Sequence, residues 1–141
     1  MGQFEIIYAI AVIVFVILFL KTLGRRSSRG GRVRTRFTAD FDVLDSQFQT
    51  CRPKADYSIF KDGTPHKIDI EVERLPLIVG EVLDIHINKI PLSSIPVKGD
   101  FEAEFEHWSD GEVSFPQITE GDKVDIIYQS KVVISGVFRK R

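Results

Sequence analysis

One stretch of sequence constrains this chain more than any other: a nearly uncharged run from Phe4 to Leu20. It reads FEIIYAIAVIVFVILFL, 17 residues whose one charged member is Glu5. As a helix the run would be about 25 Å long, and about 33 Å if it extended from Gly2 to Leu23. Its apolar residues follow no 3.6-residue stripe, so the helix would be apolar on every side, as helices in lipid are. The sequence therefore predicts a transmembrane helix over residues 1–23.

Two other interpretations of the run fit less well. A cleaved secretory signal needs a basic start and small residues at its end, whereas this chain begins MGQFE and continues KTLGRRSSRGG after the run. N-myristoylation at Gly2 would need Ser or Thr at position 6, where the chain has Ile6. We therefore expect the run to stay in the protein as a membrane anchor. The candidate anchor residues are Phe4, Ile7, Tyr8, Ala9, Ala11, Phe15 and Phe19.

Basic residues gather on one side only of the apolar run. Residues 21–36 hold seven of them and no acid, and none precedes the run. Because positively charged flanks stay in the cytoplasm, we expect the N-terminus outside the cell and the following domain inside. Residues 24–36 are rich in Gly, Ser and Arg, which predicts a flexible linker that meets anionic lipid headgroups. The residues expected to set topology or bind headgroups are Lys21, Arg25, Arg26, Arg29, Arg32, Arg34 and Arg36.

The rest of the chain, residues 37–141, has the pattern of a β-domain. Apolar and polar residues alternate with a period of two in several stretches, which indicates strands with one face in a core and one in water. Turn sequences with Gly and Asp separate the stretches, and no further helix is expected. The predicted fold is all-β, an antiparallel sandwich or barrel of about 7–8 strands, joined to one N-terminal transmembrane α-helix. The alternating apolar positions are Phe37, Ala39, Phe41, Val43, Ile68, Ile70, Val72, Ile85, Ile87, Phe101, Ala103, Phe105, Val124, Ile126 and Tyr128.

A short stretch recurs within this domain. VGEVLDI at 79–85 resembles EGDKVDI at 120–126. Two interpretations stay open: two related β-units packed face to face, or two similar hairpin starts that arose by chance. Apolar runs that contain proline, at 75–79, 90–92 and 95–97, are typical of edges and loops. Such runs close the end of a core or form a docking patch.

No motif for a chemical reaction is present. The three histidines, His66, His86 and His107, show no metal-ligand spacing, and the chain has no HExxH, nucleophile-elbow or phosphate-binding glycine motif. Acidic residues are numerous, but their alternation with apolar residues explains them as a water-facing sheet surface. We therefore expect no enzyme activity, no catalytic residue, no cofactor and no metal site.

Two rows of acids are the most informative polar feature. Residues 37–141 hold 12 basic and 19 acidic groups, a balance of −7. If the rows lay on neighbouring strands, like charges would face each other and destabilise the sheet, so the simpler expectation is that they lie in separate sheets and keep edges soluble. The alternative is an electrostatic face for a basic partner. The rows are Asp69, Glu71 and Glu73, and Glu102, Glu104 and Glu106.

Together these features predict a single-pass accessory subunit of a larger membrane complex, of the respiratory or photosynthetic kind. Its β-domain would cap the cytoplasmic side of that complex. The expected partners are membrane lipids and other subunits, since an acidic domain repels nucleic acid, and no small-molecule substrate is expected. The alternative is a membrane-tethered β-domain that binds a soluble ligand, a lipid or a peptide.

Overall fold

The computed structural model describes residues 33–60 and 65–141. The predicted anchor, residues 1–23, and residues 24–32 of the predicted linker lie outside the described residues. Within those that are described, no helix has the length and apolar character needed to span a bilayer. The elements are β1 (Val33–Val43), the 3-10 helix η1 (Ser46–Phe48), β2 (Arg52–Phe60), β3 (Lys67–Glu73), β4 (Val82–Ile87), β5 (Ile90–Pro96), β6 (Ala103–Trp108), β7 (Lys123–Tyr128) and β8 (Lys131–Lys140).

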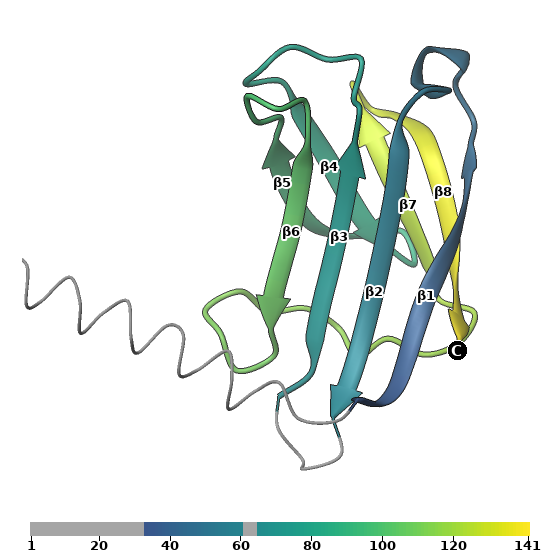
Figure 1. Cartoon of the computed structure of the whole chain (residues 1–141), viewed down its shortest axis with the longest axis vertical. Helices are drawn as coiled ribbons and strands as arrows, with labels where there is room; N and C mark the ends of the chain where they lie inside the picture. Colours follow the sequence, from purple (N-terminus) through teal and green to yellow (C-terminus); the bar gives the residue numbers. More distant parts are fainter. Residues whose placement is uncertain (1–32, 61–64) are drawn as a thin grey trace, which may run out of the picture. The chain divides into compact units, whose positions relative to one another are not determined.

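Eight strands form one antiparallel sheet that curls into a nearly closed barrel (Figure 1). Along the sheet the strands follow the order β5-β4-β7-β8-β1-β2-β3-β6, so β5 and β6 are its two edges. These edges lie next to each other but form no ladder. The predicted all-β antiparallel fold is therefore confirmed, in its barrel form. The proline-containing runs at 90–92 and 95–97 lie in β5, except for Val97. β5 is an edge strand, where the missing N–H donor of proline is tolerated.

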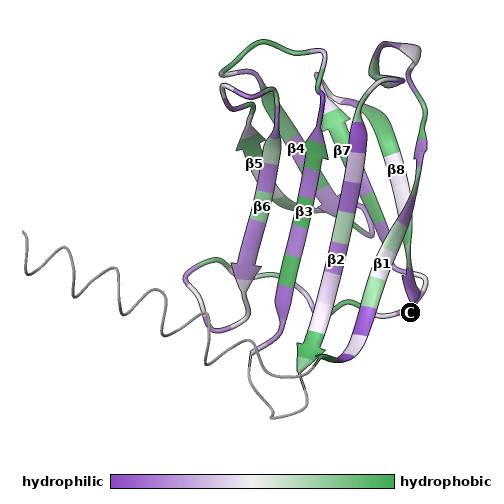
Figure 2. Ribbon diagram, viewed as in Figure 1, coloured by the Kyte–Doolittle hydropathy of each residue, from purple (hydrophilic) through white to green (hydrophobic). Residues whose placement is uncertain are grey.

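The period-two pattern decides which face of most strands is buried. In β3, Ile68, Ile70 and Val72 are fully buried, while the intervening residues are partly exposed. Figure 2 shows the same alternation of hydrophobic and hydrophilic residues along β3 and β6. Apolar side chains from all eight strands fill the barrel, together with Phe48 of η1 and Ile118 of the β6–β7 connection. The inward row of each strand thus becomes part of one packed core.

The start of β1 differs from the prediction. The strand begins at Val33, before the expected start of the domain at Phe37, because Val33 and Thr35 already pair with β2 on either side of a register shift. β-branched residues favour such extended backbone. Arg34 and Arg36 are therefore strand residues with exposed side chains and not part of the linker.

Strand β7 departs from period two. The predicted alternation places Asp125 in water, but only 5% of this residue is exposed. Its neighbours across the sheet are His86 on β4 and Ser135 on β8. The Ser135 hydroxyl donates a 2.6 Å hydrogen bond to the Asp125 carboxylate, and a buried polar group is tolerated when it is bonded in this way. β7 is a central strand, and its residues 124–127 are all buried.

The two similar sequence stretches open two equivalent hairpins, β4–β5 and β7–β8. Gly80 and Gly121 have φ angles of 94° and 91°, a region that glycine adopts without strain. The Gly80 N–H donates to the carbonyl of Val97 at 3.0 Å, and the Gly121 N–H donates to that of Phe138 at 2.8 Å. The repeat in the sequence is therefore also a repeat in the backbone.

These two hairpins lie side by side in the sheet. β4 pairs with β7, and Ile85 lies directly opposite Ile126. A register shift follows each of these residues, before His86 in one hairpin and before Ile127 in the other. The prediction that the units pack face to face is therefore wrong, because in a single curled sheet they join edge to edge.

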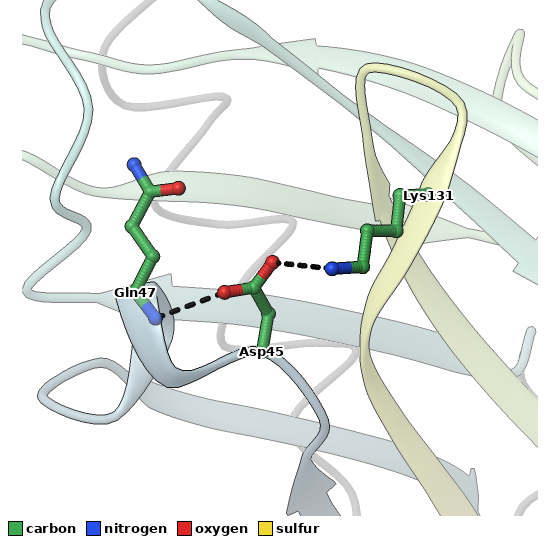
Figure 3. A network of polar contacts seen from close by, with 3 residues as sticks. All are labelled: Asp45, Gln47 and Lys131. Carbon is green, nitrogen blue, oxygen red and sulfur yellow. Dashed lines mark hydrogen bonds and ion pairs between the residues drawn. The ribbon is translucent and has the colours of Figure 1, made fainter.

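A polar network ties together two connections at the end of the barrel remote from Val33 (Figure 3). Asp45 caps η1, and its carboxylate accepts a hydrogen bond from the Gln47 N–H at 2.9 Å. The same carboxylate lies 3.0 Å from the Lys131 ammonium nitrogen at the start of β8. The Gln47 hydrogen bond, and then Lys131, lower the pKa of Asp45. The network thus links the β1–β2 connection to the β7–β8 hairpin.

Candidate functional site

The two acidic rows come together on the outside of the barrel. β3 pairs with β6, with Asp69 opposite Glu106 and Glu71 opposite Glu104. The expectation that the rows lie in separate sheets is therefore wrong. The chain leaves β3, forms the β4–β5 hairpin and returns beside β3, so two strands that are distant in sequence become neighbours. We call this surface the acidic face; its residues are Asp69, Glu71, Glu73, Glu102, Glu104 and Glu106.

Strand β2 borders the acidic face and supplies both signs of charge. Asp56 lies opposite Asp69, so three carboxylates follow one another in the cross-strand row that ends at Glu106. Farther along β2, Arg52 and Lys54 lie opposite acidic residues of β3. Basic side chains therefore approach the face from the β2 side, whereas β6 carries no Lys or Arg.

Asp69 occupies an unfavourable position in the middle of this row. Burial, and after it the negative charges of Glu104 and Glu106, raise the pKa of Asp69 to about 6. The Asp69 Oδ1 atom is buried and has no hydrogen-bond partner among the described residues. A cation that reached this atom would stabilise the charged form.

Glu71 has a pKa that is raised still further, to about 7. The largest cause is a hydrogen bond with Glu73, which requires a proton on one of the two carboxyl groups. Burial and the charge of Glu104 act in the same direction. The acidic face therefore holds a carboxyl group that exchanges its proton near neutral pH.

One basic residue lies within the face itself. The Lys67 ammonium nitrogen is 3.0 Å from Glu106 Oε1 and 5.6 Å from the centre of the Trp108 ring. The Trp108 ring also stacks on Phe60, with 5.4 Å between ring centres. Partly exposed ion pairs of this kind contribute about 1 kcal/mol or less, so Lys67 does not offset the remaining acids.

The geometry suits positively charged ligands. Within each of two triads, the carboxylate oxygens lie within 4.8 Å of one another. Oxygens at this spacing fit a divalent cation or the N–H donors of lysine and arginine. Clustered exposed acids are common in proteins that bind no metal, so the triads define the charge of a ligand and not its identity. The triads share Glu71 and are Asp69, Glu71 and Glu104, and Glu71, Glu73 and Glu102.

Two of the three histidines have side-chain partners in the barrel. The Tyr57 hydroxyl and His66 Nδ1 form a hydrogen bond, and Tyr57 is almost fully buried. The His107 ring lies 4.4 Å from the Phe105 ring, between ring centres, at the end of the inward row of β6. Among the described residues, the groups with metal-like spacing are the two acidic triads, and neither contains a histidine.

Two of the seven basic residues predicted to set topology lie in the described part of the chain. Arg34 and Arg36 lie near the start of strand β1, and both side chains are exposed to solvent. Arg36 lines a shallow hollow together with Asp56 and Asp69, next to the acidic face. The other five, Lys21, Arg25, Arg26, Arg29 and Arg32, lie outside the described residues.

The apolar run at 75–79 is partly buried and partly exposed. Leu75 and Leu77 are each 4% exposed and close the end of the core, whereas Ile78 and Val79 are 71% and 58% exposed. In the β5–β6 connection, Phe101 is 51% exposed, although alternation with Ala103 and Phe105 predicts it to face inward. Its φ angle of 61° explains the difference, because a left-handed residue interrupts the strand geometry.

An apolar hollow lies beside the β4–β5 turn and is lined in part by Ile87, Ile90 and Pro116. Its volume is about 150 Å³, which is smaller than the roughly 300 Å³ at the lower end of small-molecule pockets. The hollow therefore adds no support for a small-molecule substrate.

No protein family model matches the chain, and no curated protein matches it. Its function must therefore be inferred from the residues of the acidic face and from their surroundings.

Proposed function

We propose that this chain is an accessory subunit of a larger membrane complex. Its N-terminal apolar run anchors it, and the β-domain lies on the cytoplasmic side. The acidic face binds a basic surface of another subunit, while the arginines before β1 contact anionic lipid headgroups. The alternative is a tethered module that binds a soluble basic peptide through the same face.

The observation that carries the proposal is the placement of like charges directly opposite each other. Asp69 faces Glu106, and Glu71 faces Glu104, in successive cross-strand pairs on the outer face of the sheet. A pair of like charges in this position destabilises a sheet by up to about 1 kcal/mol. Lysine or arginine side chains of a partner would remove the repulsion between these carboxylates. The repulsion destabilises the free domain, so its removal would favour binding.

The charge distribution around the face supports a partner that lies over β3 and β6. Arg52 and Lys54 stand on the β2 side, and Lys67 is engaged by Glu106. Glu104 is the acid of β6 that faces Glu71, and β6 brings no base of its own. Association driven by these charges would weaken as salt screens them.

Replacing Glu71 and Glu104 by glutamine tests this proposal. The tagged full-length chain, extracted from its native membrane in mild detergent, is expected to retain a partner subunit in near-stoichiometric amount. The double variant keeps the size and polarity of both side chains but removes two charges, and we expect it to retain at least about tenfold less partner. Quantitative mass spectrometry of the purified material measures the ratio.

A matched control removes the same two charges elsewhere. Glu112→Gln with Glu120→Gln neutralises two exposed side chains of the β6–β7 connection and should leave partner retention unchanged. Recovery of the wild-type chain alone at full yield would contradict membership of a complex. Equal retention by both double variants would contradict the role of the acidic face, and retention of a soluble basic peptide would favour the alternative.

A further inference from the structure

We infer that the partner segment on the acidic face is amphipathic: it carries large apolar side chains beside its basic ones. The apolar side chains dock on an exposed apolar tip, which consists of Ile78 and Val79 in the β3–β4 connection and Phe101 in the β5–β6 connection. This inference rests on the proposed function, because the acidic face supplies the charges that select the basic part of the segment.

The apolar tip is continuous with the acidic face. Glu73 is the last residue of β3, and the β3–β4 connection with Ile78 and Val79 follows it directly. Glu102 comes immediately after Phe101 and shares a carboxylate triad with Glu73. The acidic rows therefore run along β3 and β6 and end at the tip. One extended segment could cover both surfaces.

The tip differs from ordinary surface because its exposed apolar side chains come from two adjoining connections. Ile78 is 71%, Val79 58% and Phe101 51% exposed, and they belong to two connections that lie at the same end of the barrel (Figure 1). Scattered single apolar residues are normal on a protein surface, whereas several on adjoining loops mark interaction sites. Aromatic side chains such as Phe101 are enriched in the cores of interfaces.

Backbone hydrogen bonds between the two connections hold the tip together. The Leu75 N–H donates to the carbonyl of Phe101 at 3.0 Å, and the Gly80 N–H donates to that of Val97 at 3.0 Å. The Phe101 N–H in turn donates to the carbonyl of Lys98 at 3.0 Å. Because this surface is ordered before a partner arrives, binding loses little conformational entropy.

Glu81 fixes the turn that presents Ile78. One oxygen of its carboxylate accepts a hydrogen bond from the Ile78 N–H at 3.0 Å, and the other accepts one from the Tyr128 hydroxyl at 2.6 Å. The turn is thereby attached to β7 in the barrel wall. Phe101 is held in a left-handed conformation, φ 61°, which an aromatic residue adopts only where its surroundings enforce it.

Charge favours a protein segment over a lipid surface as the occupant. The residues next to the tip are mostly acidic, and anionic headgroups would be repelled by them. The chain also enters the domain at Val33, at the end of the barrel opposite the tip. The flanking acids are Glu73, Glu81, Asp100 and Glu102, and the flanking bases are Arg74 and Lys98.

Two labelled peptides test the inference on the full-length chain in phosphatidylcholine nanodiscs. One is oligolysine, and the other alternates leucine with lysine at the same number of lysines. We expect the leucine–lysine peptide to bind about tenfold more tightly than oligolysine, after subtraction of binding to empty nanodiscs. Ile78→Ser with Phe101→Ser should remove that advantage and leave oligolysine binding unchanged. Ile90→Ser, at a residue 69% exposed near the opposite end, is the matched control and should change neither.

The outcomes separate the tip from the acidic face. If Glu71→Gln with Glu104→Gln weakens both peptides but the tip variant keeps the leucine–lysine advantage, the proposed function stands and this inference is wrong. If the charge variant weakens neither peptide, the proposed function fails. Loss of the advantage in Ile90→Ser as well would mean unspecific apolar binding. Tip-dependent capture of added phosphatidylcholine vesicles, without a peptide effect, would assign the tip to lipid and overturn the inference.

Discussion

Glu71→Gln combined with Glu104→Gln is expected to raise the free energy of unfolding of the β-domain by about 1 kcal/mol at pH 8, after allowance for solvent screening at this partly exposed face. The two side chains lie opposite each other on β3 and β6, and the glutamines remove their repulsion. The variant should therefore be more stable and yet bind its partner less well. That combination distinguishes a binding surface from an acidic surface that only keeps the domain soluble.

The same substitutions should change the pH dependence of stability. The pKa of Asp69 is raised to about 6, chiefly by burial, and that of Glu71 to about 7, chiefly by the hydrogen bond with Glu73. Both exceed the ordinary values near 4, so the folded state binds these protons more tightly than the unfolded state does. Their contribution to stability is therefore greatest below about pH 4 and falls as the pH rises to about 7.

Urea unfolding of the full-length chain in detergent micelles, followed by fluorescence of its one tryptophan, Trp108, measures both effects. Between pH 5 and pH 8 the wild-type domain should lose more stability than the Glu71→Gln, Glu104→Gln variant. The control variant, Glu112→Gln with Glu120→Gln, should follow the wild type. Two results would refute the repulsion between the rows. One is a Glu71→Gln, Glu104→Gln variant that is less stable than the wild type at pH 8. The other is a variant that loses as much stability as the wild type between pH 5 and pH 8.

Ile126→Ala is expected to lower the free energy of unfolding by about 2–5 kcal/mol. Ile126 on β7 and Ile85 on β4 lie opposite each other where the two repeated hairpins meet, and both are fully buried. The substitution leaves a cavity at that junction, which neighbours from two hairpins line. The milder Ile126→Val should cost about 0.5–1.5 kcal/mol.

Ile90→Ala, at an exposed position on the β4–β5 hairpin, is the control for this prediction and should change stability by less than about 0.5 kcal/mol. The same urea unfolding curves measure all three variants. If Ile126→Ala were no more destabilising than Ile90→Ala, the hairpin junction would not be part of the stabilising core. The edge-to-edge arrangement of the repeat would then be contradicted.

Alternation predicted strands β1, β3, β4, β6 and β7 of this domain, but it did not predict β2 or which strands are neighbours. Alternation places Ile68, Ile70 and Val72 inside and the acids between them outside, because side chains of a strand point alternately to its two faces. It carries no information on which strand pairs with β3, since that depends on where the chain returns after β5. The same gap explains Asp125, whose burial follows from the flanking strands and its bond to Ser135.

Backbone conformation explains two further differences between the sequence-based expectation and the structure. The β4–β5 turn uses Asn88 and Lys89, and the β7–β8 turn uses Gln129 and Ser130, all four with positive φ. Such tight turns are usually predicted from a glycine in the sequence, and neither of these two turns contains one. The exposure of Phe101 was not predicted for a related reason, because an alternating pattern does not reveal a left-handed backbone conformation.

The acidic face could be predicted as a set of residues but not as a site. All six acids follow from alternation, whereas their opposition across one ladder, the raised pKa of Glu71 and the buried oxygen of Asp69 depend on tertiary structure. Likewise, the apolar run at 75–79 indicated either a core plug or a docking patch, and only burial divides Leu77 from Ile78.

Site-specific photocrosslinking in intact cells tests the central claim most directly. A photoreactive residue replaces Lys54, which lies opposite Glu71, so every acid of the acidic face stays in place. The control carries the same residue in place of the exposed Lys123 on β7. We expect position 54, and not position 123, to crosslink to a basic segment of another membrane subunit, with the product lost in the Glu71→Gln, Glu104→Gln background. No product at position 54, or a product that persists when both charges are removed, would contradict the assignment of the acidic face as the binding surface.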